Sequence, residues 1–236
     1  MSKAVKDDIE KGTERAKREL VMNFSFDTIK DFDAHINTSI SCYKEICDAV
    51  KSLSKYFVVD DSYIYDIGCS KGTMLESIDI GKKKNVKKIG IDCSLNLLPE
   101  NRSDIAFLNF DLKNEFVFTN ASLILSVFTM QFLPPSRRQS VMNNIYRGLI
   151  KGGGLIFCEK IFSAHSKIQD MFTFNYYDFK AKSFSSEEIL DKEKSLRDIM
   201  HPFSHEENVE MMRNAGFSVF DVFVKSFNFE GIVAIK

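Results

Sequence analysis

The sequence predicts an α/β protein with a doubly wound, mostly parallel sheet that ends in an antiparallel terminal hairpin. Three observations lead to this prediction. Short apolar segments recur along the chain, helical patterns separate most of them, and the last two apolar segments follow each other directly. Parallel strands need a crossover between them, whereas consecutive strands can pair antiparallel through a short turn.

The N-terminal region is expected to precede the sheet. Residues 1–22 are rich in charged, helix-forming side chains and predict a charged tail or helix. They contain no apolar run of the kind that forms a signal peptide or membrane anchor, so we expect no membrane association. Between residues 24 and 57, apolar side chains recur every three or four positions, which predicts helices. We expect residues 23–236 to form a single domain.

The strands are predicted from apolar runs that are short enough for buried parallel strands. Pro134 and Pro135 mark the start of a helix between the fourth and fifth strands. A polar, helix-rich stretch then extends to Ala215. The expected strands are residues 63–67, 88–91, 105–110, 121–128 and 152–158, and residues 217–224 and 231–235 are expected to form the hairpin.

Composition excludes several classes of function. The chain has 236 residues and a formal net charge of -1, so no overall positive field would draw it to nucleic acid. Its five cysteines are scattered, and Cys42 and Cys47 lack the spacing of a zinc site. We therefore expect reduced thiols, a cytoplasmic location and no metal site.

A possible ligand-binding turn lies in YDIGCSKG, residues 65–72, between the first strand and the following helix. The strand ends in Asp66, and the chain then turns through Gly68, Cys69, Ser70 and Gly72. Glycine permits a tight turn with a ligand close to the backbone. A diphosphate-binding fingerprint would need a third glycine where Cys69 and Ser70 stand, so we expect a nucleoside ligand without a diphosphate.

Two more aspartates follow the next strands. Asp92 lies twenty-four positions after Gly68, where a carboxylate can accept hydrogen bonds from both ribose hydroxyls. Asp111 follows the third strand, where it is expected to hold the adenine edge. Each aspartate alone is equally well explained as a cap or turn residue, but together with Asp66 they line one edge of the sheet. We therefore predict S-adenosylmethionine as the cofactor, in a Rossmann-like class I methyltransferase fold.

The end of the fourth strand lacks the loop by which DNA-base methylating enzymes hold a planar nitrogen. Ser126, Val127 and Phe128 stand there instead of an Asp-Pro-Pro-aromatic sequence. No Ser/His/Asp or Cys/His set is assembled by spacing, but methyl transfer to a nucleophilic acceptor needs mainly alignment. Tyr176 and Tyr177 either face the site, where an aromatic ring attracts the sulfonium, or fill the core.

Longer segments carry a resemblance that runs from about Phe26 to the end of the chain. They are Tyr43, YDIGCS (65–70), FTMQFLPPSRRQ (128–139), GLIKGGGLIFCEK (148–160), DFK (178–180) and FNFEGIVAIK (227–236). With these segments the chain resembles the carboxy-S-adenosylmethionine synthases, which supply carboxymethyl groups for wobble-uridine modification in tRNA. The resemblance implies a small-molecule substrate, a homodimer, and ligand contacts from Tyr43, Gly68, Cys69, Ser70, Asp92, Cys93, Asp111 and Leu112.

Two positions depart from the family pattern. The family's asparagine at the end of the fourth strand is Val127 here, and its arginine that grips the transferred carboxylate aligns with Glu193. At about 4 Å and an effective dielectric of about 20, two like charges repel by ~4 kcal/mol, so Glu193 argues against a carboxylated ligand. Arg197 is expected one helical turn further on, on the same face, as an alternative partner for that carboxylate.

Four functions stay open, with Phe128, Tyr176, Glu193 and Arg197 as the candidate catalytic residues. The preferred one is methyl transfer from S-adenosylmethionine to a small acceptor, with Glu193 holding a cationic group of that acceptor. The second is synthesis of carboxy-S-adenosylmethionine with prephenate as the carboxyl source and Arg197 as the carboxylate partner. The third is cyclisation of the cofactor's own arm to azetidine-2-carboxylate in an aromatic cage of Phe128 and Tyr176. The fourth is a catalytically silent binding module, which the apolar Val127 favours.

Overall fold

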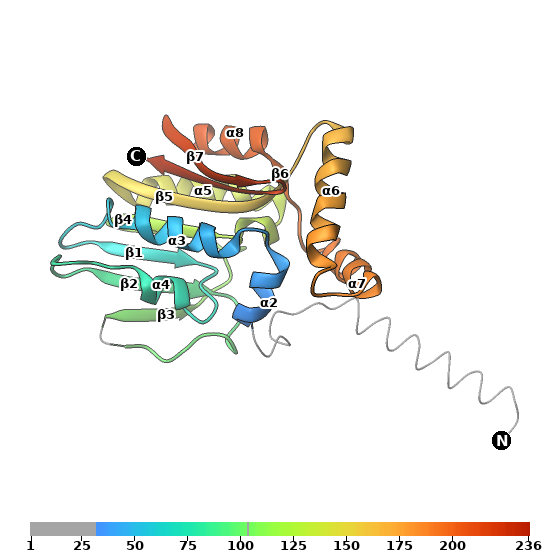
Figure 1. The fold of residues 1–236 in the computed structure, drawn as a ribbon. Helices are drawn as coiled ribbons and strands as arrows, with labels where there is room; N and C mark the ends of the chain where they lie inside the picture. The colour runs from blue at the N-terminus through green and yellow to red at the C-terminus, as the bar shows by residue number, and fades with distance from the viewer. Residues whose placement is uncertain (1–31, 103) are drawn as a thin grey trace, which may run out of the picture.

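A computed structural model describes residues 32–102 and 104–236 (Figure 1). The predicted tail of residues 1–22 lies outside the described residues. The strands are β1 (Tyr63–Ile67), β2 (Lys87–Asp92), β3 (Ile105–Asn109), β4 (Ala121–Val127), β5 (Leu149–Phe162), β6 (Phe203–Ser204), β7 (Val219–Ser226) and β8 (Phe229–Ile235). The helices are α2 (Phe32–Ser39), α3 (Tyr43–Ser54), α4 (Thr73–Ser77), the 3-10 turn η2 (Met130–Phe132), α5 (Pro135–Gly148), α6 (Ser166–Lys180), α7 (Ser186–Leu196) and α8 (His205–Ala215).

The strands form one sheet in the order β3-β2-β1-β4-β5-β8-β7, and β6 pairs with the end of β5. The pairs β1–β2, β2–β3, β1–β4 and β4–β5 are parallel. The pairs β5–β8 and β7–β8 are antiparallel, as the sequence predicts for the terminal hairpin. The chain order reverses between β1 and β4, and open α/β sheets bind ligands at such a switch point.

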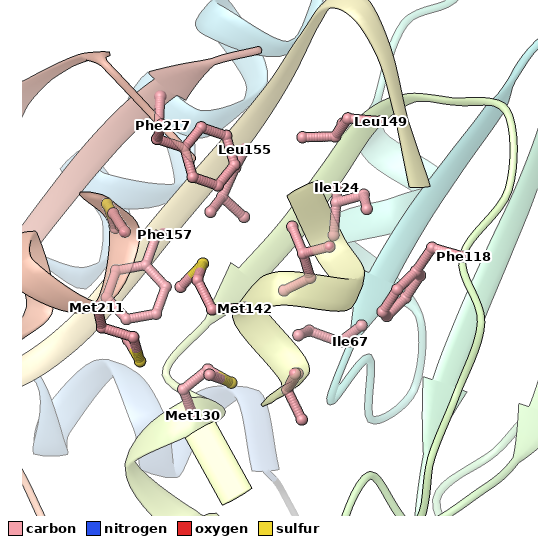
Figure 2. Close-up of a cluster of buried hydrophobic side chains, with 14 of the residues drawn as sticks. Ile67, Phe118, Ile124, Met130, Met142, Leu149, Leu155, Phe157, Met211 and Phe217 are labelled. Carbon is pink, nitrogen blue, oxygen red and sulfur yellow. The ribbon is translucent and has the colours of Figure 1, made fainter. Parts of the chain in front are cut away.

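Helices cover both faces of the sheet, with α3 and α4 on one face and α5 and α8 on the other (Figure 1). Successive side chains of a strand point to opposite faces. Ile124 accordingly packs in the core with Met142, which Figure 2 shows, whereas Leu123 and Leu125 pack in the other core with Ile46 of α3. Helices α6 and α7 lie beyond the carboxyl ends of the strands (Figure 1). No helix in the described ranges is long and apolar enough to cross a bilayer.

Three differences from the predicted elements are larger than a shift of one or two residues at a strand end. The helical region before the sheet is divided, because Cys42, with a φ of 60°, separates α2 from α3. Strand β5 begins earlier and ends later than the apolar run, and β8 pairs with it from Gly154 to Lys160. Strand β6 was not predicted, because two residues are too few to show a period.

Candidate active site

A cavity of about 550 Å³ lies at the carboxyl ends of β1, β2 and β4. This is the switch point of the sheet, and the volume is typical of a small-molecule site. Its lining comes from the loops after these strands, from α6, and from the segment that includes Lys192 and Met200. The sheet edge therefore forms one side of the cavity and the helices beyond the strand ends form the other.

The loop after β1 brings backbone against this cavity. Gly68, Ser70 and Gly72 have φ values of 72°, 49° and 77°. A Cβ on Gly68 would collide with the Thr129 side chain, and one on Gly72 would lie 2.5 Å from Cε1 of Phe107. Glycine at 68 thus allows the loop to approach Thr129 after the end of β4, and glycine at 72 allows the Phe107 ring to pack against the loop.

Asp92 connects the loops after β1 and β2. Its Oδ2 accepts a hydrogen bond from the backbone N of Ser70, and its Oδ1 accepts one from the backbone N of Ser94, both at 2.9 Å. These bonds fix the carboxylate at the cavity edge, and each oxygen keeps a lone pair for another donor. Asp92 therefore fits the predicted contact with the ribose hydroxyls.

Asp66 also borders the cavity, but it is only 3% exposed. Burial, and secondarily the charge of Asp92, raises the pKa of Asp66 to about 8. A cation in the cavity would stabilise the ionised carboxylate. S-adenosylmethionine carries both an ammonium and a sulfonium group, so this buried acid fits the predicted cofactor.

The predicted adenine end combines apolar walls with one carboxylate. Cys93, Asp111 and Leu112 border the cavity, together with Phe110. Burial raises the pKa of the Cys93 thiol, which keeps it neutral at physiological pH. Asp111 Oδ1 accepts a hydrogen bond from the backbone N of Lys113 at 2.9 Å. An apolar slot with a polar acceptor at its edge suits an adenine ring.

Four aromatic side chains form a wall of the cavity. Phe128 has a φ of 59°, and its backbone N donates to the carbonyl oxygen of Cys158 at 2.7 Å. The ring centroid of Phe128 lies 6.2 Å from that of Tyr43 and 5.9 Å from that of Phe229. Phe229 in turn lies 5.6 Å from Tyr176. All four rings border the cavity, so Tyr176 faces the site.

Glu159 holds the loop that carries this wall. Its Oε1 accepts from the backbone N of Met130 at 2.9 Å, and its Oε2 accepts from that of Gln131 at 2.7 Å. Gln131 Oε1 accepts from the backbone N of Lys160 at 2.7 Å. Burial raises the pKa of Glu159 to about 8, although the Arg138 charge and the backbone donors lower it. The sequence pattern does not predict this network, and its one signal is the charged pair Glu159 and Lys160 at the end of an apolar run.

Three lysines, Lys160, Lys180 and Lys192, border the cavity beyond the aromatic wall, and we call this part the lysine end. The Nζ atoms of Lys160 and Lys180 lie 4.7 and 5.2 Å from the ring centroid of Tyr176. Burial lowers the pKa of all three lysines, and that of Lys192, which Lys180 also repels, to about 8. Lys160 forms an ion pair with Glu193, at 3.7 Å. Clustered cations of this kind favour an anionic ligand.

The structure brings most of the predicted site residues together. Those that border the cavity are Tyr43, Asp66, Gly68, Cys69, Ser70, Asp92, Cys93, Asp111, Leu112, Val127, Phe128 and Tyr176. Gly72, Glu193 and Arg197 do not border it. Arg197 caps the C-terminus of α7 and is exposed. The ligand contacts of all these residues stay predictions.

Curated carboxy-S-adenosyl-L-methionine synthases from several bacteria are similar to this chain. The Staphylococcus epidermidis protein is 35% identical over 215 residues, which cover 89% of this chain and 94% of that protein. The Shewanella pealeana protein is 35% identical over 92% of this chain and 95% of its own length. The chain belongs to the carboxy-S-adenosylmethionine synthase family. No family model matches it.

Solved structures share the fold of this synthase-family chain. Human N-acetylserotonin methyltransferase in complex with S-adenosylmethionine has a TM-score of 0.50 and 13% identity, and the match covers 82% of this chain and 56% of the human chain. A methyltransferase candidate from Haloferax volcanii, in complex with the Trm112 methyltransferase activator, has a TM-score of 0.55 and 14% identity, covering 82% of this chain and 91% of that chain. The predicted Rossmann-like class I methyltransferase fold is confirmed.

The family also confirms the predicted enzyme class, an S-adenosylmethionine-dependent transferase, and S-adenosylmethionine as its cofactor. The two residues that depart from the pattern of this synthase family, Val127 and Glu193, lie differently with respect to the cavity. Val127 borders the cavity, so the missing asparagine leaves an apolar surface there. Glu193 lies behind the lining, paired with Lys160.

Proposed function

We propose that this chain is a carboxy-S-adenosylmethionine synthase. The observation that carries the proposal is the lysine end of the cofactor cavity. Three lysines border it, whereas Glu193 does not. The repulsion expected between Glu193 and a carboxylated sulfonium is therefore offset by cations that lie nearer to the ligand. The curated relatives are named carboxy-S-adenosyl-L-methionine synthases, which supports this function over methylation of a separate acceptor.

The proposed reaction replaces a hydrogen of the sulfonium methyl group by a carboxylate. Following the resemblance, S-adenosylmethionine and prephenate give carboxy-S-adenosylmethionine, phenylpyruvate and water. The bond between the prephenate ring and its ring carboxylate breaks as the ring becomes aromatic, and the carboxylate carbon bonds to the former methyl carbon. The ring hydroxyl leaves as hydroxide and takes up the methyl proton. In this proposal Asp92 binds the ribose, and Asp66 lies beside the cationic arm. Lys160 and Lys180 orient the carboxylates by direct charge-assisted contact.

Methylation of a cationic acceptor is less well supported by the same charges. Lys180 and Lys192 would repel such an acceptor, and Glu193 already pairs with Lys160. Arg197 is not needed as the carboxylate partner, because it is exposed and is not part of the cavity lining. In this proposal the lysines have the carboxylate-binding role that helical spacing suggests for Arg197.

Cyclisation of the cofactor in an aromatic cage also fits the geometry poorly. The ring of Tyr176 has the ammonium groups of Lys160 and Lys180 within cation–π distance. A sulfonium would compete with these two cations for the same ring. The remaining alternative, a silent binding module, predicts that the protein binds S-adenosylmethionine and turns over none of it.

The decisive experiment starts from protein purified without added cofactor. Small molecules released from it are identified by mass spectrometry, and the protein is then incubated with S-adenosylmethionine and prephenate. We expect carboxy-S-adenosylmethionine in both samples, and much less from an Asp92→Ala variant under the same conditions, because that variant should bind the cofactor more weakly. Azetidine-2-carboxylate as the product would instead favour cyclisation, and unchanged S-adenosylmethionine would favour a binding module.

We also propose that the protein is a cytoplasmic homodimer, as the resemblance implies. Helix α6 exposes Ile168, Met171 and Phe174 at intervals of three residues, which places them on one face. A self-complementary apolar face is typical of a twofold interface. The five cysteines are free, which suits a reducing compartment. Light scattering on the wild type and on Phe174→Glu should show a dimer and a monomer, respectively.

A further inference from the structure

Glu193 lies against the lysine end, behind the cavity lining, and is a carboxylate that the proposed reaction does not use. Lys160 comes from the end of β5, Lys180 from the end of α6, and Glu193 from α7, next to Lys192. Lys180 Nζ lies over the rings of Tyr176 and Phe184 and has no carboxylate within ion-pair distance among the described residues. Glu193, which pairs with Lys160, therefore offsets part of this positive charge.

The ion pair between Glu193 and Lys160 is loose. The Oε1 to Nζ distance is 3.7 Å, and the two side chains are 22% and 14% exposed. Glu193 Oε1 is buried and has no hydrogen-bond partner. A buried carboxylate oxygen without a hydrogen bond is costly, so this pair contributes less than a well-formed one. Another carboxylate with better geometry can compete with Glu193 for Lys160.

Lys160 itself is well placed to change partner. Its backbone N is fixed by Gln131 Oε1, and its ammonium group lies over the Tyr176 ring at the cavity wall. The side chain borders the cavity on one side and touches Glu193 on the other. A small rotation of the flexible lysine stem can thus transfer its charge from Glu193 to a ligand.

We propose that Glu193 is an internal competitor for Lys160, which weakens the binding of the carboxylated cofactor and speeds its release. This inference rests on the proposed function. Glu193 acts through Lys160 and touches no ligand, so it is a positioning residue. By the resemblance, an arginine at this position would bind the carboxylate of the ligand. The glutamate instead lowers the affinity of the site for the carboxylated product and so speeds product release.

The test compares two ligands by isothermal titration calorimetry on the full chain. Carboxy-S-adenosylmethionine and S-adenosylmethionine are titrated into the wild type, Glu193→Gln and the control Glu187→Gln. Glu187 is an exposed carboxylate on the same helix. We expect Glu193→Gln to bind the carboxylated ligand about tenfold more tightly, or ~1.4 kcal/mol, and S-adenosylmethionine within about twofold of the wild type. The control should match the wild type with both ligands.

The rate of product release gives a second measurement. A purely structural role of Glu193 would leave this rate unchanged. Rapid-mixing displacement of bound carboxy-S-adenosylmethionine should be about tenfold slower in Glu193→Gln, because interface changes act mostly on dissociation. If this variant does not fold, Glu193→Asp, with a carboxylate one methylene shorter, should show the same direction of change.

The two ways of failing are distinguishable. If the wild type makes no carboxy-S-adenosylmethionine from S-adenosylmethionine and prephenate, the proposed function is wrong. If the wild type makes it, but Glu193→Gln neither binds it more tightly nor releases it more slowly, the inference about Glu193 is wrong. A parallel tightening for S-adenosylmethionine would also overturn it, because the effect would then not depend on the carboxylate.

Discussion

Replacing Asp66 by asparagine should reduce the pH dependence of cofactor binding. Asp66 is almost completely buried, and its pKa is raised from 3.8 to about 8 by burial and by the charge of Asp92. Below pH 8 the free protein therefore carries a proton on Asp66. A cationic ligand favours the ionised carboxylate, so binding should release that proton.

The expected size follows from linkage. One proton released on binding changes the affinity by up to about tenfold for each pH unit, or ~1.36 kcal/mol. The affinity for S-adenosylmethionine should thus rise between pH 6 and pH 8 and level off above the pKa of Asp66 of about 8. In Asp66→Asn the rise should be much smaller, because no carboxyl group titrates at this position.

The assay is calorimetry in two buffers of different ionisation enthalpy, which counts the protons released. We expect between about 0.5 and 1 proton at pH 7 for the wild type and fewer for Asp66→Asn. Lys192, with a pKa of about 8, titrates in the same range, so only the difference between the two proteins is assigned to Asp66. Asp198→Asn, at an exposed position, is the matched control. Equal proton release from wild type and Asp66→Asn would refute the argument.

Three further predictions concern other parts of the site. Asp92→Ala should weaken the binding of S-adenosylmethionine by ~1.5 to 3 kcal/mol, the size of a hydrogen bond to a charged group. If calorimetry shows the same affinity as in the wild type, the ribose contact is contradicted. Gly72→Ala should lower the free energy of unfolding by ~1 to 3 kcal/mol, because the positive φ of residue 72 and the closeness of Phe107 disfavour a Cβ. A denaturant unfolding curve identical to that of the wild type would contradict this prediction. Lys180→Met should reduce the preference for carboxy-S-adenosylmethionine over S-adenosylmethionine by about tenfold in competition binding, and an unchanged ratio would remove Lys180 from the carboxylate contact.

The buried acids also affect stability. The pKa values of Asp66 and Glu159 are both raised to about 8 in the fold, above their ordinary values of 3.8 and 4.5. Each contribution to the free energy of unfolding is therefore fully present below the ordinary pKa and is lost as the pH rises to about 8. The ligand-free protein should become less stable over this range, and bound S-adenosylmethionine should offset the loss at Asp66.

The sheet could be predicted from the sequence because its strands are short apolar runs with clear ends. β1 coincides with the predicted residues 63–67. The glycines of the following loop, together with Asp66, indicate a ligand-binding turn. That the residues after β1, β2 and β3 line one cavity was predictable for the same reason, since they follow strand ends; their contact with a nucleoside stays a prediction. These are local signals that a single segment carries.

The lysine end could not be predicted in this way. Lys160, Lys180 and Lys192 lie on three different elements, and each alone is an ordinary lysine in a chain with many. Only the tertiary packing of α6 and α7 beyond the strand ends brings the three together. Helical spacing also placed Arg197 on the face of Glu193, but Arg197, at the C-terminal cap of α7, is exposed and does not border the cavity.

Replacing an arginine by Glu193 need not reverse the preference of the site for a carboxylate, because a ligand responds to the sum of the charges around it. Glu193 lies behind Lys160 as seen from the cavity, and Lys180 and Lys192 border the cavity themselves. Coulomb energy falls with distance, so the nearer cations outweigh the more distant anion. The substitution then reduces the attraction for a carboxylate without abolishing it, and a synthase with a weaker hold on its product is the expected result.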